Sequence, residues 1–141
     1  MTAAVGVAIA VTFVWSGLVL AISFIETPLK FRAPEVTLRI GLGIGRLVFR
    51  ALNVFEVALA LVLVAAGLVE GPPLSVLITG AVAVAALAVQ LLVVRPSLTR
   101  RSDLVLAGAD APRSHAHHGY VGLEIVKLTA LISTGTLLLS A

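Results

Sequence analysis

The sequence contains no cysteine and few charges, since only 12% of its 141 residues are Asp, Glu, Lys or Arg. The absence of cysteine excludes a disulfide framework, a thiolate metal site and a cysteine nucleophile. An ordinary soluble domain carries about a quarter charged residues, and here the apolar fraction reaches 60%. Because so little polar surface cannot cover so much apolar material in water, the composition excludes a soluble domain and indicates a membrane protein.

Long, predominantly apolar runs make up most of the sequence. About 20 helical residues cross the hydrocarbon core of a bilayer, and the sequence offers four such stretches, at about 3–25, 38–69, 74–94 and 118–140. We therefore predict an all-α integral membrane protein, a four-helix bundle with up-down-up-down order that forms a single transmembrane domain over 1–141. No basic residue precedes Lys30, so the first run lacks the charged start of a secretory signal and is expected to remain as the first helix.

The basic residues predict the orientation, because loops that stay in the cytoplasm retain Lys and Arg. They lie mainly after the first predicted helix and after the third, whereas the connection after the second helix and both chain ends have none. We expect both termini outside and the two basic loops in the cytoplasm. The formal net charge of +3 therefore reflects topology and does not indicate a nucleic-acid partner.

A weak internal repeat divides the chain into two helical hairpins. Residues 53–59 in the second predicted helix (Asn-Val-Phe-Glu-Val-Ala-Leu) resemble residues 122–128 in the fourth (Gly-Leu-Glu-Ile-Val-Lys-Leu). Tandem hairpins with the same orientation would be related by an axis along the membrane normal. Chance similarity between short apolar segments is the alternative, so the repeat serves only as a pointer.

Polar side chains inside the predicted spans gather in the cytoplasmic half. At about 100° of rotation per residue, those of the second helix share one stripe and those of the fourth share another. An ionised side chain in lipid is costly unless it is paired or hydrated, so we expect a common polar interior centred on Arg50, Glu56, Glu124 and Lys127. The predicted ligand site comprises Arg46, Arg50, Asn53, Glu56, Gln90, Tyr120, Glu124 and Lys127.

A structural role is the alternative for these charges. Paired polar side chains can hydrogen-bond across a bundle and fix its register, and a long basic side chain near the interface, such as Arg46, can extend to the headgroups. Intramembrane ionisable groups are nevertheless functional candidates by default. Glu124 and Lys127 lie about 9 Å and 13 Å inside the boundary if His118 marks it, and for them both interpretations stay open.

The connection after the first helix contains a candidate loop or lid. Glu26, Lys30 and Arg32 lie in a segment where Pro28 and Pro34 bracket a stiff turn. A basic turn of this kind suits an anionic headgroup surface, or closes over a ligand.

Three histidines precede the fourth helix and are candidate metal or haem ligands, because imidazole commonly binds transition metals. The sequence has no thiol and no second ligand cluster, so a polar cap at the membrane boundary explains His115, His117 and His118 equally well. We favour no cofactor, with haem as the runner-up, and expect no haem because none of the three lies deep in a span. Gly41, Gly43 and Gly45 resemble a nucleotide loop only superficially, since no strand precedes them.

Several short motifs resemble those of a known group. They are Trp15-x-Gly17, the stretch Phe24-Ile-Glu-Thr-Pro-Leu-Lys-Phe-Arg-Ala-Pro34, the basic start of the second helix, and His118 before the fourth. In these the chain resembles small bacterial four-helix membrane proteins of unknown function, a group related to eukaryotic transmembrane proteins implicated in cisplatin resistance. This resemblance implies the cytoplasmic (inner) membrane of a bacterium.

The four-span layout is more distantly similar to copper-resistance-D-like proteins and to the HemJ-type protoporphyrinogen oxidase, which holds haem through a histidine. No histidine lies in the first helix of this chain. An axial haem ligand is therefore not carried over.

The leading hypothesis is a non-enzymatic membrane protein whose polar cavity, in the cytoplasmic half, binds or transports a small anionic or amphipathic ligand. Arg50 and Lys127 would supply positive charge, and Glu56 and Glu124 would balance and orient them. One alternative is a redox enzyme that holds haem or quinone in the same cavity, and another is an accessory subunit of a larger membrane complex. The expected partners are membrane lipid, a small-molecule ligand, and a second copy or a membrane complex, without nucleic acid.

Overall fold

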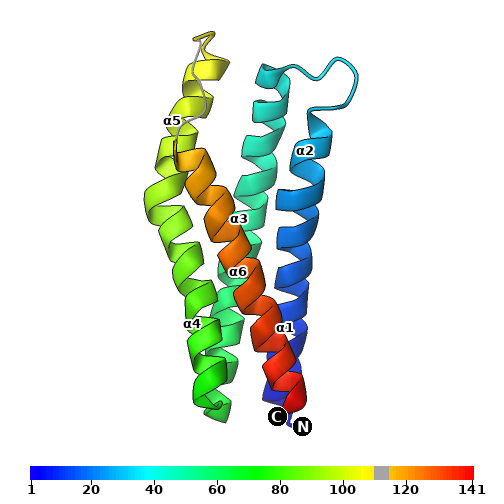
Figure 1. Cartoon of the computed structure of the whole chain (residues 1–141), viewed down its shortest axis with the longest axis vertical. Coiled ribbons are helices and arrows are strands. Elements are labelled where there is room, and N and C mark those ends of the chain that lie inside the picture. Colours follow the sequence, from blue (N-terminus) through cyan, green and yellow to red (C-terminus); the bar gives the residue numbers. More distant parts are fainter. Residues whose placement is uncertain (110–114) are drawn as a thin grey trace.

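The structure is a computed structural model that describes residues 1–109 and 115–141, with side chains throughout except at residues 115 and 116. The described residues form four helical rods that run alternately up and down one long axis (Figure 1). The first rod consists of α1 (Ala3–Val19), a π-helical segment η1 (Leu20–Glu26) and α2 (Thr27–Lys30), and the second is α3 (Leu38–Glu70). The third consists of α4 (Leu74–Val89), a π-helical segment η2 (Gln90–Val94) and α5 (Arg95–Leu106), and the fourth is α6 (His115–Ser140).

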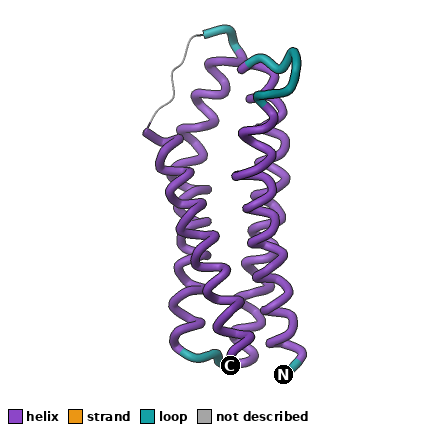
Figure 2. Tube along the Cα trace, turned by 45° about the vertical axis from the view of Figure 1, so that its right-hand side comes forward, coloured by secondary structure: helices purple, strands orange, loops and turns teal. Residues whose placement is uncertain are grey.

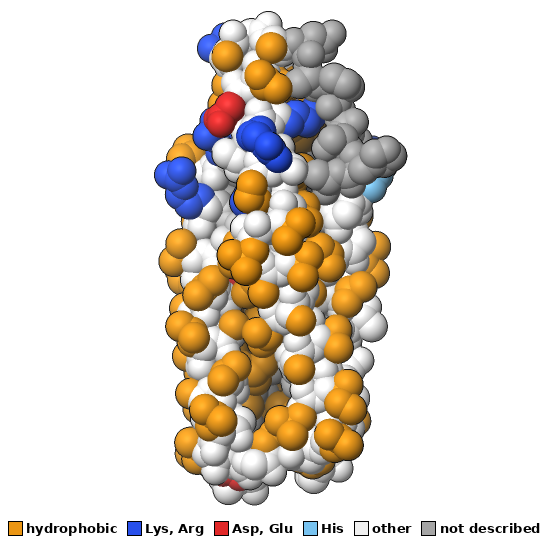
Figure 3. Space-filling view, turned by 90° about the vertical axis from the view of Figure 1, so that its left-hand side faces the viewer, with side chains coloured by type: hydrophobic (Ala, Val, Ile, Leu, Met, Phe, Trp, Pro, Cys, Tyr) orange, Lys and Arg blue, Asp and Glu red, His pale blue; other side chains and the backbone are white. Residues whose placement is uncertain are grey.

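The surface of the bundle suits a lipid environment. Four helical stretches of the described chain are long and apolar enough to cross a membrane: Ala3–Lys30, Leu38–Glu70, Leu74–Leu106 and His117–Ser140. Many large apolar side chains are exposed, and in Figure 3 hydrophobic side chains cover much of the long face, with Lys and Arg gathered toward one end. Such an extended apolar surface is stable in lipid and not in water. The predicted all-α integral membrane four-helix bundle is confirmed.

The first and third rods run beyond the predicted helices at about 3–25 and 74–94. Each continues through a proline, Pro28 in the first turn of α2 and Pro96 in the first turn of α5. A π-helical segment directly precedes each of these short helices, and its altered backbone pairing accommodates a residue that has no N–H to donate. Polar residues mark the end of an apolar run, but they do not end a helix. The helix therefore continues past Pro28, and the turn expected between Pro28 and Pro34 begins only after Lys30.

The connection between α3 and α4 is as tight as its sequence predicts. Gly71 has φ 59° and ψ 63°, the left-handed conformation that glycine adopts without strain at a helix end, and α4 begins at Leu74 after two prolines. Thr2 Oγ1 donates a hydrogen bond to Glu70 Oε1 at 2.5 Å, which brings the start of the chain to this connection. Both chain termini lie at this end of the bundle (Figure 1), which we call the terminal end, and the opposite end is the basic end.

The rods pack as two hairpins that meet toward the terminal end. α1 packs against α3, α4 packs against α6, and α6 also packs against α1. Figure 1 shows α6 crossing the bundle from beside α5 to beside α1. The buried apolar core includes Trp15, Val19, Ala83 and Leu131. Toward the basic end the two hairpins stand farther apart (Figure 2), and the candidate site lies there.

Candidate functional site

A cluster of acidic and basic side chains lies buried at the centre of the bundle. The ammonium group of Lys127 contacts Glu56 Oε2 and, at 2.5 Å, Glu124 Oε1. It also donates to Gln90 Oε1 at 2.7 Å, and Gln90 Nε2 in turn donates to Glu124 Oε1 at 2.7 Å. The side chains of Lys127 and Glu56 are 0% exposed and that of Glu124 is 1% exposed. The three N–H groups of the ammonium therefore have three acceptors, drawn from α3, η2 and α6.

Neutral side chains donate further hydrogen bonds to the two carboxylates of this cluster. Trp15 Nε1 donates to Glu56 Oε2 at 2.8 Å, and Asn53 Nδ2 donates to Glu56 Oε1 at 3.2 Å. Ser23 Oγ donates to Glu124 Oε2. Trp15 lies on α1 and Ser23 on η1, so all four rods contribute side chains to one hydrogen-bonded network. Such a network restricts how the rods can rotate and slide against one another.

Lys127 has no donor left for a ligand. Taking charges out of water costs several kcal/mol per ion, and the loss is offset only where pairing and hydrogen bonds are both satisfied. The contacts of Lys127 with Glu56, Glu124 and Gln90 use its ammonium completely. No N–H of the ammonium is therefore left to donate to a ligand, and the hypothesis that Lys127 supplies positive charge to a ligand stays a prediction. The cluster contains two carboxylates and one ammonium, so the charge of Lys127 balances one of the two negative charges.

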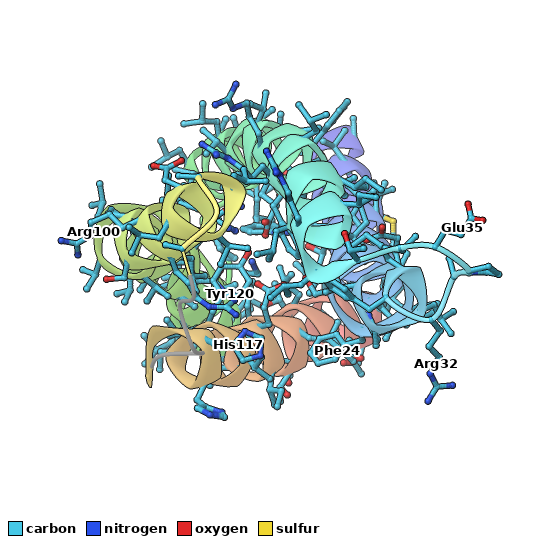
Figure 4. All side chains as sticks on the ribbon, turned by 90° about the horizontal axis from the view of Figure 1, so that it is seen from above. Phe24, Arg32, Glu35, Arg100, His117 and Tyr120 are labelled. Carbon is cyan, nitrogen blue, oxygen red and sulfur yellow. The ribbon has the colours of Figure 1, made fainter. Side chains whose placement is uncertain are left out.

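An open cavity of about 1020 Å³ lies between this cluster and the basic end. All four rods line it, and in the view from above Phe24, His117 and Tyr120 lie around the space between the rods (Figure 4). The other lining residues are divided about evenly between apolar ones and polar or charged ones. Glu124 is the member of the cluster's central triad that reaches the wall, whereas Glu56 and Lys127 lie beneath it. A cavity of this size accommodates a drug-sized ligand.

The cavity wall is predominantly basic among its charged residues. Of the described lining residues, Glu124 is the one acid, and the basic ones are Lys30, Arg46, Arg50, Arg95 and Arg101. The side chain of Lys30 is turned inward, only 6% exposed, with its Nζ 3.7 Å from Glu26 Oε1. Arg46 Nη1 pairs with Asp103 Oδ1 at 2.7 Å. This ion pair joins α3 to α5, so Arg46 does more than extend toward the headgroups.

Arg95 packs against two aromatic rings on the cavity wall. Its Cζ lies 4.7 Å from the ring centre of Tyr120 and 5.1 Å from that of Phe49. The two rings meet edge to face with their centres 5.8 Å apart. A guanidinium over an aromatic face is attracted by the ring quadrupole, so these contacts hold the Arg95 side chain in place. Its Nε and Nη2 have no hydrogen-bond partner among the described residues.

The structure brings most of the predicted ligand-site residues together in two layers. The buried layer contains Asn53, Glu56, Gln90, Glu124 and Lys127, and the cavity wall contains Arg46, Arg50, Asn53, Tyr120 and Glu124. The expectation that Arg50 belongs to the central cluster is wrong, because Arg50 is exposed. Six residues rotate a helix by about 600°, so Arg50 and Glu56 point to different sides of α3. Of the predicted lid residues, Lys30 faces the cavity, Glu26 pairs with it, and Arg32 points away from the bundle (Figure 4).

Three residues that matter to this geometry are missing from the predicted site: Trp15, Ser23 and Arg95. Trp15 is the one tryptophan of the chain, and a buried indole needs an acceptor for its N–H. Ser23 shares a polar stripe of the first rod, which was a usable signal. Arg95 gave no such signal, since its place after an apolar run is typical of a loop residue at the membrane boundary.

Two of the three histidines, His117 and His118, have described side chains. His117 lines the cavity and His118 is exposed, with their ring centres 5.7 Å apart. The side chain of His115 lies outside the described part of the chain. Within that part, no group of three or more His, Cys, Asp or Glu side chains is arranged to hold a metal ion.

Comparisons with protein-family models, curated proteins and solved structures found no match. Function must therefore be argued from the chemistry of the site itself.

Proposed function

We propose that the protein binds or passes a small anionic or amphipathic ligand in the cavity at the basic end of the bundle. The observation that carries this proposal is the cavity wall, which combines apolar side chains with five basic ones and a single acid, Glu124. Ligand sites in proteins are largely apolar with a few polar groups that fix orientation. The carboxylate of Glu124 contacts Lys127 and accepts from Gln90 and Ser23, so an anion at the basic end meets mainly positive charge.

The location proposed for this activity is the cytoplasmic membrane of a bacterium, with both termini outside. The basic residues around the cavity would then lie on the cytoplasmic side. A ligand would enter from the cytoplasm or from the inner leaflet, and the buried cluster would close the floor of the cavity.

A pair of substitutions on α3 tests whether the cavity binds. Val57 lines the cavity and is 39% exposed, whereas Val64, two turns farther along the same helix, is 46% exposed and does not line it. We expect anionic amphiphiles to raise the melting temperature of the wild-type protein in a neutral detergent, since a ligand that binds the folded state stabilises it. Val57→Trp should obstruct the part of the cavity next to α3 and reduce this shift, and Val64→Trp should keep it.

Equal shifts in both variants, or no shift in the wild type, would refute the proposal. An absorption spectrum of the same preparation distinguishes it from a haem- or quinone-binding protein.

A further inference from the structure

All the buried side-chain groups that lack a hydrogen-bond partner among the described residues lie on the wall of the cavity at the basic end. They are Nε and Nη2 of Arg95, Oγ of Ser102 and the hydroxyl oxygen of Tyr120. A buried polar group without a partner costs free energy and is uncommon in folded proteins. Their concentration in one place, in a protein whose central network is so fully paired, indicates a site built for a partner that is not part of the chain.

The atoms of Arg95 define the chemistry of that partner. Nε and Nη2 belong to the same edge of the guanidinium, and their N–H bonds run side by side as a fork. Such a fork matches two oxygens of one carboxylate or phosphate group. Tyr120 packs on the same guanidinium with its ring centre 4.7 Å from Arg95 Cζ, and its hydroxyl is a further donor on the wall of the same cavity. The ring of Phe49 also contacts the guanidinium and helps to hold it in position.

The surroundings of Arg95 indicate that this oxyanion has an apolar tail. Leu91 lies one helical turn deeper than Arg95 on the third rod, and Val54 and Val57 lie deeper than Phe49 on α3, all lining the same cavity. Val54 is 66% exposed and Val57 is 39% exposed, so an acyl or alkyl chain can pack on them. A small hydrated anion would leave these apolar walls uncovered.

We propose that Arg95 and Tyr120 anchor the oxyanion head of an amphiphile, a carboxylate or phosphate group, while its apolar tail lies along Val54, Val57 and Leu91. This inference rests on the proposed function and specifies the ligand class and the anchoring residue. Ser102 lies seven residues beyond Arg95 toward the basic end, about 10 Å along the helix. It marks the direction in which a larger polar headgroup extends.

Three probes separate head from tail in a binding experiment on the wild-type protein in a neutral detergent. Dodecyl phosphate has both the oxyanion and the tail, dodecyl glucoside has the same tail with a neutral head, and inorganic phosphate has the oxyanion alone. We expect dodecyl phosphate to bind at least about tenfold more tightly than dodecyl glucoside, since a charge-assisted hydrogen bond contributes roughly this factor. We expect a preference of at least about tenfold over inorganic phosphate as well, because only the alkyl chain buries apolar surface in the cavity. Binding is measured by non-denaturing mass spectrometry and by the shift in melting temperature.

Substitutions then test the anchor. Arg95→Gln should weaken dodecyl phosphate at least about tenfold and leave dodecyl glucoside unchanged, because it removes the charged fork and keeps most of the volume. Arg95→Lys keeps the charge without the fork and should fall in between. Tyr120→Phe should weaken dodecyl phosphate by a few-fold, the effect of one neutral hydrogen bond. Arg100→Gln is the matched control, since Arg100 lies on the same helix, is exposed and points away from the bundle (Figure 4).

Each failure has a separate meaning. If inorganic phosphate binds as tightly as dodecyl phosphate, the ligand is a free anion and the amphiphile is refuted. If dodecyl glucoside matches dodecyl phosphate, or if Arg95→Gln binds dodecyl phosphate like the wild type, the anchor is refuted while the ligand-binding cavity stands. If none of the probes binds, both proposals fail. Should Arg95→Gln not fold, Arg95→Lys and the comparison of headgroups on the wild type still decide the anchor.

Discussion

At the scale of single residues, the charge count around Lys127 is the dominant feature of the interior. Sequence spacing alone pairs Lys127 with Glu124, three residues away on one helix face. In the structure the ammonium is shared between Glu124 and Glu56, and Glu56 also accepts from Trp15. The arrangement therefore tolerates the loss of one carboxylate far better than the loss of the ammonium, because one acid and one base remain balanced.

We predict unequal effects for substitutions in this triad. Lys127→Met should destabilise the protein by about 3–5 kcal/mol, the cost of leaving buried charge without its partner, and Glu124→Gln should cost markedly less because the Glu56–Lys127 pair survives. Adding Glu56→Gln and Glu124→Gln to Lys127→Met should recover part of the loss. Thermal unfolding of these variants in one detergent checks the order, and an effect of Glu124→Gln as large as that of Lys127→Met would contradict it.

The triple variant also separates structure from function. If it folds and still binds dodecyl phosphate like the wild type, the cluster only holds the rods together. If it folds and loses the ligand, the cluster takes part in binding.

At the scale of helices, a glycine on α3 determines how closely the turn after α2 can pack against α3 at the basic end. The three glycines that superficially resemble a nucleotide loop, Gly41, Gly43 and Gly45, lie inside α3. A Cβ at Gly41 would lie 2.1 Å from Phe31 Cε1, whereas one at Gly43 would have nothing within 4 Å. The absence of a side chain at Gly41 thus lets the turn after α2 fold its Phe31 ring onto α3, at the edge of the cavity.

We therefore predict opposite results for two neighbouring substitutions. Gly41→Ala should displace the Phe31 ring and destabilise the protein by about 1–3 kcal/mol, as overpacking does. Gly43→Ala should be neutral or stabilising by up to about 1 kcal/mol, since alanine is the better helix former. Melting temperatures in detergent measure both, and equal effects would show that Phe31 moves aside without cost.

At the scale of the whole molecule, the charges divide the bundle into two unlike ends. Lys30, Arg46, Arg95 and Arg100 lie toward the end opposite the termini, and the connection through Gly71 carries no basic residue. The retention of basic segments in the cytoplasm would leave the chain ends outside. The hairpin repeat suggested by residues 53–59 and 122–128 stays a prediction at this scale, although α1 with α3 and α4 with α6 do pack as hairpins.

Single cysteines test this orientation, because the chain has no cysteine of its own and gives no background labelling. Ser102 is buried, so the exposed Ala109 is the better position at the basic end, and the exposed Ala141 serves the terminal end. In intact cells a thiol reagent that cannot cross the membrane should label Ala141→Cys, and it should label Ala109→Cys only after lysis. The reverse labelling pattern would contradict the predicted orientation and would place the cavity on the outer side of the membrane.

Much of this protein is determined by its sequence alone. Four apolar runs longer than the membrane is thick can only be spanning helices, and the polar residues on them must face one another because lipid does not solvate charge. The predicted fold is confirmed for this reason, and so is the gathering of Asn53, Gln90 and Glu124 in the interior.

Only the tertiary structure decided which polar residues are partners. Periodicity assigns a residue to a face of its helix, but a partner depends on how each helix is rotated and tilted against the others. Lys127 therefore reaches Glu56 as well as Glu124, whereas Arg50 is exposed and lines the cavity. Arg95 belongs to the cavity because the third rod continues as a helix past the apolar run, which packs its guanidinium on Phe49 and Tyr120.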